Sequence, residues 1–302
     1  MHKPLIPVVL PIRNGVSVSC VALPHRGGGN MLDFLVARFP AISRTQWRER
    51  LEAGDVVDER GARVAANRAF EPGLRLFYYR SLGSEPALPE LETVLYQDAH
   101  LLVADKPHYM PVVPSGRYLH SSLLVRLKRS TGIDDLVPLH RIDRDTAGLV
   151  LFSVQKATRG VYHSVFRDRA ISKTYEAVAP WRPDQILPAT RESRLVEADE
   201  FFRMQEVPGE PNTLTRMAVL EHGEHWARYA LSPITGKRHQ LRVHMAALGL
   251  PLRNDPLYPT VNDAADGDWS RPLQLLARSL QFNDPLTREA RRFYSQRSLA
   301  PF

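Results

Sequence analysis

The chain has 302 residues, of which 43% are hydrophobic and 24% charged, a composition typical of a globular protein rather than a disordered one. Forty Lys and Arg residues against 33 Asp and Glu residues give a net charge of +7 and an isoelectric point near 9.7, which favours a polyanionic partner such as nucleic acid. A single cysteine, Cys20, excludes an internal disulfide, and no apolar run approaches the ~20 residues that span a membrane, so we expect a cytoplasmic protein.

Residues 1–30 are rich in proline and glycine, and we expect them to form a flexible N-terminal extension. A compact unit is predicted over residues 31–80. Apolar residues at helical spacing begin this unit, Pro40 stops the first helix, and Ser43 is placed to cap a second helix that ends before Gly54. Two strands should follow, at residues 56–57 and 74–79, with a turn at residues 58–61 between them. These elements predict a small α+β domain.

Residues 81–91 carry two prolines, a glycine and no periodicity, which predicts a linker. From residue 92 to residue 302, strand-like runs alternate with helical patterns. This favours a second α+β domain, built around a mixed, mainly antiparallel sheet with flanking helices. The predicted strands lie at residues 91–96, 101–104, 149–154, 175–179 and 226–231, and the predicted helices lie at residues 122–128, 156–167 and 238–248.

The second helix of the small unit carries a basic face. Arg44 and Arg48 lie four residues apart and share this face, whereas Trp47 and Leu51 share the apolar face. Such a helix suits a phosphate backbone, although a solvated charged face is an ordinary alternative. The order of the elements around it resembles the S4-type RNA-binding domain, and this resemblance implies that Arg44 and Arg48 contact RNA.

The strongest chemical signal is the segment PLHRIDRDTAGL at residues 138–149. It places two carboxylates, Asp143 and Asp145, and two guanidiniums, Arg141 and Arg144, on a short polar segment before an apolar strand, a common position for catalytic residues. Neighbouring charges that merely pair with one another in a loop are the plain alternative. The segment closely resembles the motif His-Arg-Leu-Asp-x-x-Thr-Ser-Gly-Leu of the RluA-type pseudouridine synthases, and this resemblance implies that Asp143 is the catalytic carboxylate.

Further segments resemble the same family in the same order. The segment SKTYEAV at residues 172–178 resembles the second motif of the family and implies that Tyr175 belongs to the catalytic site. The segment TGKRHQLRVHMAALG at residues 235–249 resembles the third motif, whose basic residue falls on Arg242. Lys106 with Pro107, and the segment NDPLY at residues 254–258, also match, and we expect Lys106 to contact RNA. The resemblance spans about residues 92 to 285, besides the S4-like residues 31–80.

Four residues depart from the pattern of the family. Ile142 stands in place of the usual Leu, Ala147 in place of the usual Ser, and Lys237 with Arg238 where Gly-Arg-Thr is more typical. Because none of them is one of the three implied catalytic residues, they bear on the choice of target more than on the chemistry.

The implied reaction isomerises uridine in structured RNA to pseudouridine: the bond from C1′ to N1 breaks, and C1′ joins C5. It needs no cofactor, in agreement with a sequence that has no P-loop and no dinucleotide-binding glycine pattern. A carboxylate is required, either to attack C1′ or to remove a sugar proton, and both remain open. Arg242 would keep Asp143 charged within a dry pocket, and Tyr175 would stack on the uracil and assist removal of the C5 proton.

A uridine in structured RNA must leave its stack to reach such a pocket. The resemblance implies that Arg141 fills the vacated space, and we expect His140 to orient the loop beside the RNA. His239 and His244 lie on different faces of a predicted helix with no third ligand nearby, so we predict no metal site. The expected partner is ribosomal or transfer RNA, and the expected oligomeric state is a monomer.

Two other classes of function remain open. A non-catalytic RNA-binding or ribosome-associated protein on the same scaffold would have no use for Asp143, Tyr175 and Arg242 together. A hydrolase that uses Asp143 and Asp145 as its acid and base would need both carboxylates, whereas a synthase would need only Asp143.

Overall fold

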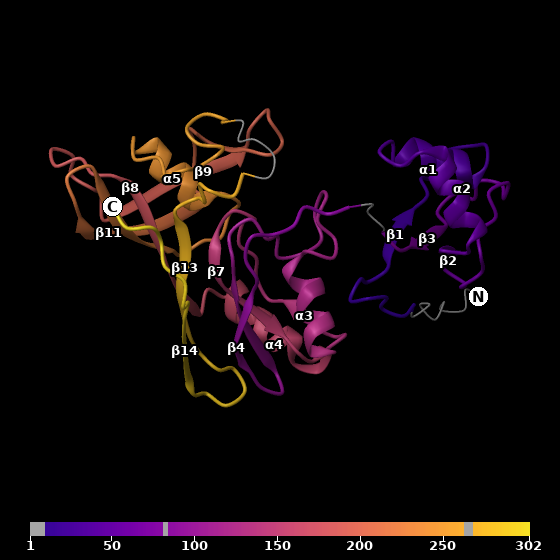
Figure 1. Cartoon of the computed structure of the whole chain (residues 1–302), viewed down its shortest axis with the longest axis horizontal. Helices are drawn as coiled ribbons and strands as arrows, with labels where there is room; N and C mark the ends of the chain where they lie inside the picture. Colours follow the sequence, from indigo (N-terminus) through magenta and orange to yellow (C-terminus); the bar gives the residue numbers. More distant parts are fainter. Residues whose placement is uncertain (1–9, 81–83, 263–267) are drawn as a thin grey trace. The chain divides into compact units, whose positions relative to one another are not determined.

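The chain divides into two compact units, Met1–Ser84 and Glu85–Phe302 (Figure 1). The computed structural model describes residues 10–80, 84–262 and 268–302. Residues 81–83 of the predicted linker lie outside the described residues. Its later part belongs to the second unit, because the carboxylate of Glu85 accepts hydrogen bonds from the backbone N–H groups of Leu119, His120 and Ser121 at 2.7–3.0 Å.

The first unit is a three-stranded antiparallel sheet packed against two helices. The order of the strands in the sheet is β1-β3-β2. The elements are β1 (Ser19–Ala22), α1 (Met31–Arg38), α2 (Arg44–Glu52), β2 (Val56–Asp58) and β3 (Arg75–Tyr78). Strand β1 lies inside the segment 1–30 that was expected to be a flexible extension. It pairs with β3 because Val21 and Leu23 enter the core of this unit, so the folded part begins earlier than residue 31.

The two helices of the first unit begin and end where short-range signals place them. Asn30 caps α1 by accepting a hydrogen bond from the N–H of Asp33 at 2.9 Å. Ser43 and Gln46 form a reciprocal capping box at the start of α2, which confirms the predicted cap. Trp47 and Leu51 of α2 are buried, at 0% and 4% exposure, and the opposite face carries the arginines.

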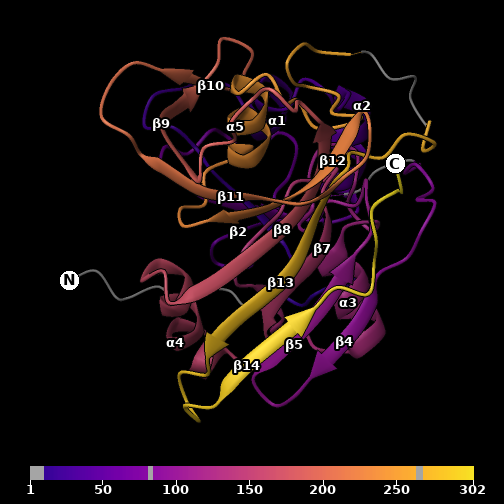
Figure 2. The same cartoon turned by 90° about the vertical axis from the view of Figure 1, so that its left-hand side faces the viewer.

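The second unit is built on one 11-stranded sheet (Figure 2). Its strand order is β10-β9-β11-β12-β8-β13-β7-β5-β4, with β14 paired to β13 and β6 paired to β7. All pairings are antiparallel except that of β13 with β7, which confirms the predicted mixed, mainly antiparallel α+β fold. The strands are β4 (Thr93–Gln97), β5 (Leu101–Lys106), β6 (Val137–Pro138), β7 (Ala147–Ser153), β8 (Ile171–Pro180), β9 (Thr190–Glu197), β10 (Met204–Val207), β11 (Thr213–His222), β12 (Trp226–Pro233), β13 (Leu275–Asn283) and β14 (Ala290–Tyr294).

In the described part of this unit, the sheet is covered by the helices α3 (Leu123–Thr131), α4 (Lys156–Arg167) and α5 (Gln240–Ala247). Alternate residues of β5 and β7 pack against α3 on one face and α4 on the other, so both strands are buried throughout. Helix α5 packs against β8 and β12 through Leu241 and Met245. Figure 2 shows α5 over β11 and β12, at the other end of the sheet from α3 and β4.

A tight approach between two strands fixes the loop that precedes β7. Gly148 has φ +111°, and a Cβ atom on it would lie 2.3 Å from the backbone oxygen of Ala277. Only glycine fits here without a shift of β13, because such a contact is far below van der Waals distance. The parallel pairing of β7 with β13 therefore depends on this glycine. The pairing in turn fixes where the preceding loop, residues 139–146, joins the sheet.

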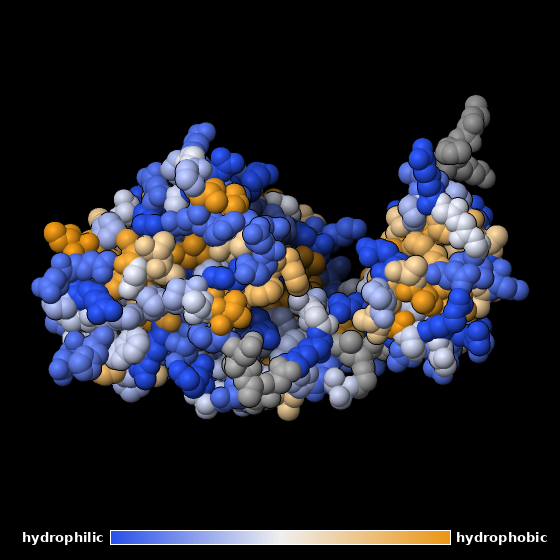
Figure 3. Space-filling view, turned by 90° about the horizontal axis from the view of Figure 1, so that it is seen from above, coloured by the Kyte–Doolittle hydropathy of each residue, from blue (hydrophilic) through white to orange (hydrophobic). Residues whose placement is uncertain are grey.

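The surface seen in Figure 3 is mostly hydrophilic, with hydrophobic residues in separate patches. Among the described hydrophobic residues of the chain, Phe201 and Ile186 are highly exposed, at 79% and 92%. Within the described ranges, none of the helices combines the length and the apolar character that crossing a membrane requires.

Candidate active site

The loop between β6 and β7 carries Asp143 on a short, well-anchored turn. The N–H of Leu139 donates to the oxygen of Leu151 at 2.8 Å, and the N–H of Thr146 donates to the oxygen of Asp143 at 3.2 Å. Ile142 is buried, so the Leu-to-Ile departure from the family motif keeps its apolar anchor. The side chain of Asp143 remains 26% exposed and faces a cavity.

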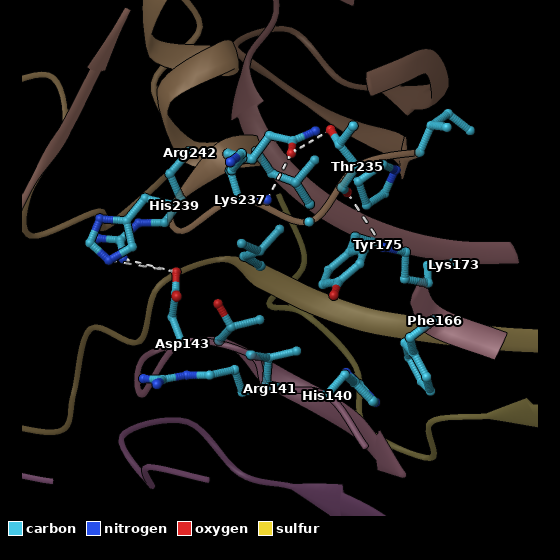
Figure 4. A pocket seen from close by; sticks show the side chains of 18 of the residues that line it. His140, Arg141, Asp143, Phe166, Lys173, Tyr175, Thr235, Lys237, His239 and Arg242 are labelled. Atoms are coloured by element: carbon cyan, nitrogen blue, oxygen red, sulfur yellow. Dashed lines mark hydrogen bonds and ion pairs between the residues drawn. The ribbon is translucent and has the colours of Figure 1, made fainter. Parts of the chain in front are cut away.

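Arg242 lies in the first turn of α5 and joins two carboxylates. Its Nε and Nη2 atoms donate to Asp255 at 2.9 and 2.7 Å. Its Nη1 atom donates to Oδ2 of Asp143 at 3.3 Å (Figure 4). The arginine is 1% exposed. Burial acts to lower the pKa of Arg242, but the hydrogen bonds and charge of Asp255, then the charge of Asp143, raise it above its ordinary value. The guanidinium is a permanent cation beside Asp143.

Asp255 binds Arg242 and is a residue that the sequence did not single out. It belongs to the segment NDPLY, which resembled the family without suggesting a role. Its side chain is fully buried, and Oδ1 also accepts hydrogen bonds from the N–H groups of Leu257 and Tyr258 at 2.8 and 3.1 Å. Asp255 therefore holds the guanidinium fork in a fixed plane and leaves one edge for Asp143.

His239 forms a second contact near Asp143. It precedes α5 with φ +55°, its Nε2 lies 3.9 Å from Oδ2 of Asp143, and its Nδ1 is hydrogen-bonded to the hydroxyl of Tyr258 at 2.9 Å. Burial lowers the pKa of His239, only partly opposed by the charge of Asp143, so the imidazole is neutral at pH 7. His244 lies in a separate network with Ser193 and Thr213, at 3.0 Å from each hydroxyl.

Tyr175 on β8 lies in the same cavity as Asp143 and Arg242, as Figure 4 shows. Burial, and then the charge of Asp143, raises the pKa of Tyr175 above its ordinary value. The phenol is therefore protonated at neutral pH and can stack or donate a hydrogen bond, whereas it is a poor acceptor for a proton.

The cavity has a volume of about 580 Å³ and a strongly basic lining. Of the described residues that line it, six are lysine or arginine and one, Asp143, is an acid. The basic residues are Arg141, Arg167, Arg169, Lys173, Lys237 and Arg242. An anionic ligand fits such a lining, because Asp143, together with Asp255 behind Arg242 and Asp168 beside Arg167, balances only part of the positive charge.

Lys106, which was expected beside the RNA, supports the loop instead. Lys106 is 0% exposed, and its ammonium donates to the backbone oxygens of Pro107 and Arg144 at 2.9 and 3.0 Å. Burial lowers the pKa of Lys106 to about 7. It cannot reach a phosphate, so its predicted contact with RNA is wrong, because the ammonium is used to fix the residues just after Asp143.

His140 accepts a hydrogen bond from the N–H of Leu151 at 3.1 Å and stacks on Phe166 with ring centroids 4.8 Å apart. Burial, and then the charge of Lys173, lowers the pKa of His140 to about 3, so it is neutral. It lines the cavity while orienting the loop. Arg141 beside it is exposed and also lines the cavity.

Asp145, the second acid of the motif, points elsewhere. It is 7% exposed, pairs with Nε of Arg144 at 2.9 Å, and is not among the residues that line the cavity. An acid and base pair of Asp143 and Asp145 across a common substrate, as a hydrolase would need, is not formed here.

In the first unit, Arg44 and Arg48 are both exposed on α2. Arg44 pairs with Asp33 of α1, an interaction of two half-exposed side chains that water screens. The two arginines share a face, as their spacing predicts.

The chain is similar to known proteins in sequence and in fold. The family model described as RNA pseudouridylate synthase matches residues 100–247. The chain is 32% identical over 244 residues to an uncharacterised RNA pseudouridine synthase of Synechocystis, covering 76% of this chain and 79% of that protein. It is 33% identical over 213 residues to the dual-specificity RNA pseudouridine synthase RluA of Pasteurella multocida, covering 68% of this chain and 92% of that protein. The solved structure of human RNA pseudouridylate synthase domain containing 1 is similar in fold, with a TM-score of 0.56, 24% identity, and coverage of 71% of this chain and 86% of that one.

Proposed function

Because this chain belongs to the RluA-type RNA pseudouridine synthases, and so isomerises uridine in RNA to pseudouridine, we propose that Asp143 is its catalytic carboxylate. The observation that carries this assignment is the 3.3 Å contact of Asp143 with Arg242 in a cavity that holds no second acid among its described lining residues. Tyr175 and Arg242 complete the proposed catalytic group.

In this proposal each residue has a separate task. The carboxylate of Asp143 acts on the ribose, at C1′ or at a sugar proton, while the C1′–N1 bond breaks. The uracil turns, C1′ bonds to C5, the C5 proton leaves and N1 gains a proton, so that the product is an isomer. Arg242 holds Asp143 in place and balances its charge, and the protonated Tyr175 supports one face of the uracil by stacking.

We further propose that the uridine reaches the cavity by leaving its stack. A nucleotide inside a duplex cannot place C1′ against a carboxylate that lies 26% exposed within a cavity, and extrusion costs only a few kcal/mol. Arg141 is exposed, lines the cavity and directly precedes the apolar anchor Ile142. It is therefore placed to occupy the space that the uracil leaves behind.

The proposed substrate is ribosomal or transfer RNA, which offers folded uridines to a basic cavity. Mapping pseudouridines in total RNA from cells with and without the gene should show the loss of particular sites in one of these RNA classes. Re-expression of the natural chain should restore these sites, and re-expression of Asp143→Asn should not. Losses confined to messenger RNA would contradict the proposed substrate class.

We propose that the first unit is an S4-like RNA-binding domain and that α2 contacts phosphates. Arg44→Ala combined with Arg48→Ala should weaken RNA binding and lower the slope of log Kd against log salt concentration by roughly 1–2, since each lost phosphate contact releases about one fewer counterion. The rate of the chemical step at saturating RNA should stay unchanged. Fluorescence anisotropy at several salt concentrations measures the slope.

The matched control is Arg60→Ala combined with Arg75→Ala, which removes the same charge from exposed positions of the same unit outside α2. An equal change of slope in both double variants would mean that only the net charge matters and that α2 is no specific contact.

The working form that we propose is a cytoplasmic monomer.

A further inference from the structure

The turn between α4 and β8 holds an arginine in a backbone conformation that favours glycine. Arg169 has φ +56°. The N–H of Arg169 donates to the oxygen of Phe166 at 3.2 Å, and the N–H of Ala170 donates to the oxygen of Val165 at 2.9 Å. This is the helix-ending pattern in which the residue at the position of Arg169 is usually glycine, because a side chain is strained there. An arginine at this position places a long cationic side chain at the end of α4, at a cost in backbone strain.

Arg169 lines the cavity together with Lys173. Among the residues that the structure describes, no carboxylate forms an ion pair with Arg169 or Lys173, and the adjacent Asp168 pairs with Arg167. Lys173 donates only a long hydrogen bond, 3.4 Å, to the oxygen of Thr235. Burial lowers the pKa of Lys173, and the charge of Arg169 lowers it further, as expected of two cations held near one another. An anion between them would relieve both effects.

This pair lies away from the reacting carboxylate. Lys173 and Tyr175 are two residues apart on β8 and so project from the same face of the strand. In Figure 4, Lys173 and Phe166 lie beyond Tyr175 as seen from Asp143. The neighbouring His140 is neutral and so adds no charge there. A group bound by Arg169 and Lys173 would therefore flank the nucleotide rather than be its reacting part.

We propose that Arg169 and Lys173 form a binding site for one backbone phosphate of the RNA strand, adjacent to the nucleotide held between Tyr175 and Asp143. The inference rests on the proposed function of the cavity. It explains why a strained position keeps a long cationic side chain: stability favours glycine at residue 169, and binding of the strand favours arginine.

The two tendencies can be separated with Arg169→Gly. The melting temperature of this variant should equal or exceed that of the natural chain, because the strain and the repulsion of Lys173 are both removed. Its affinity for a fluorescein-labelled hairpin RNA with an all-uridine loop should fall about 5- to 20-fold, and the salt slope between about 50 and 200 mM should fall by roughly 0.7–0.9. Arg169→Lys should keep the slope, since it keeps the charge.

The matched control is Arg288→Gly. Arg288 is an exposed arginine with φ +67° in the turn between β13 and β14, and it does not line the cavity. The Arg288→Gly variant loses the same charge and the same kind of strain. Its affinity for RNA and its salt slope should match those of the natural chain. An Arg169→Gly variant that binds with the natural slope, or an equal loss in Arg288→Gly, overturns the phosphate site.

If the melting temperature of Arg169→Gly is lowered, its weaker binding no longer separates a lost phosphate contact from a disturbed fold, and Arg169→Lys is used instead. A natural salt slope in Arg169→Lys supports the site, and a reduced salt slope overturns it. Failure of the proposed function has a different signature: the natural chain itself would form no pseudouridine in total RNA.

Discussion

Asp143→Asn is expected to form no measurable pseudouridine, a loss of at least about 10⁴-fold in the rate of the chemical step. The amide keeps the shape of the side chain but can neither attack C1′ nor accept a sugar proton. Affinity for RNA should stay within a few-fold, because the six basic residues that line the cavity remain in place. Release of tritium from RNA labelled at C5 of uridine measures turnover, and anisotropy measures binding.

Asp145→Asn is the matched control for this substitution. It changes the same functional group two residues away, in a carboxylate that pairs with Arg144 outside the cavity. We expect it to keep at least about a tenth of the activity, since an amide oxygen can still accept the hydrogen bond from Arg144. Natural turnover by Asp143→Asn would refute the assignment, and equal inactivation of both variants would point to a role for the whole loop.

Short-range signals in the sequence predicted the fold well where local geometry decides it. The capping box at Ser43 and the helix over residues 156–167 lie where the pattern of residues placed them. Strand β1 was missed, because its proline- and glycine-rich surroundings look unstructured until Val21 and Leu23 find the core formed by later segments. The strand order could not be predicted either, since a pairing such as that of β7 with β13 joins residues more than a hundred positions apart.

In the site, too, contacts between residues that are far apart in the sequence could not be predicted from local patterns. Asp143 and Arg242 are 99 positions apart, and only their resemblance to motifs of one family connected them before the structure was known. The role of Asp255 was invisible, because an Asp before Pro256 is most simply a turn residue. Lys106 was misassigned because the sequence shows its charge but not its burial. A lysine that ends a strand can equally face solvent or, as here, donate to Pro107 and Arg144 inside the protein.

The bridge from Asp255 through Arg242 to Asp143 depends on the shape of the guanidinium as much as on its charge. Two nitrogens are used by Asp255 and the third reaches Asp143, so a planar fork with three separate donors is required. A buried cation without such partners would destabilise the fold. The hydrogen bonds of Arg242 to Asp255 therefore also keep the guanidinium in place for its contact with Asp143. Charge alone, on a flexible stem, cannot reproduce this arrangement.

Arg242→Lys is therefore expected to lower kcat by about 10²- to 10³-fold while KM for RNA changes by no more than a few-fold. The lysine keeps the positive charge, but its single ammonium cannot bind both oxygens of Asp255 and still reach Asp143. Steady-state tritium release over a range of RNA concentrations separates the two constants. Arg278→Lys is the matched control, because Arg278 binds Glu176 with the same forked geometry, at 2.7 and 3.0 Å, outside the cavity. If Arg242→Lys kept kcat within a few-fold of the natural value, or if Arg278→Lys lowered it equally, the fixed orientation of Asp143 by Arg242 would have no part in the reaction.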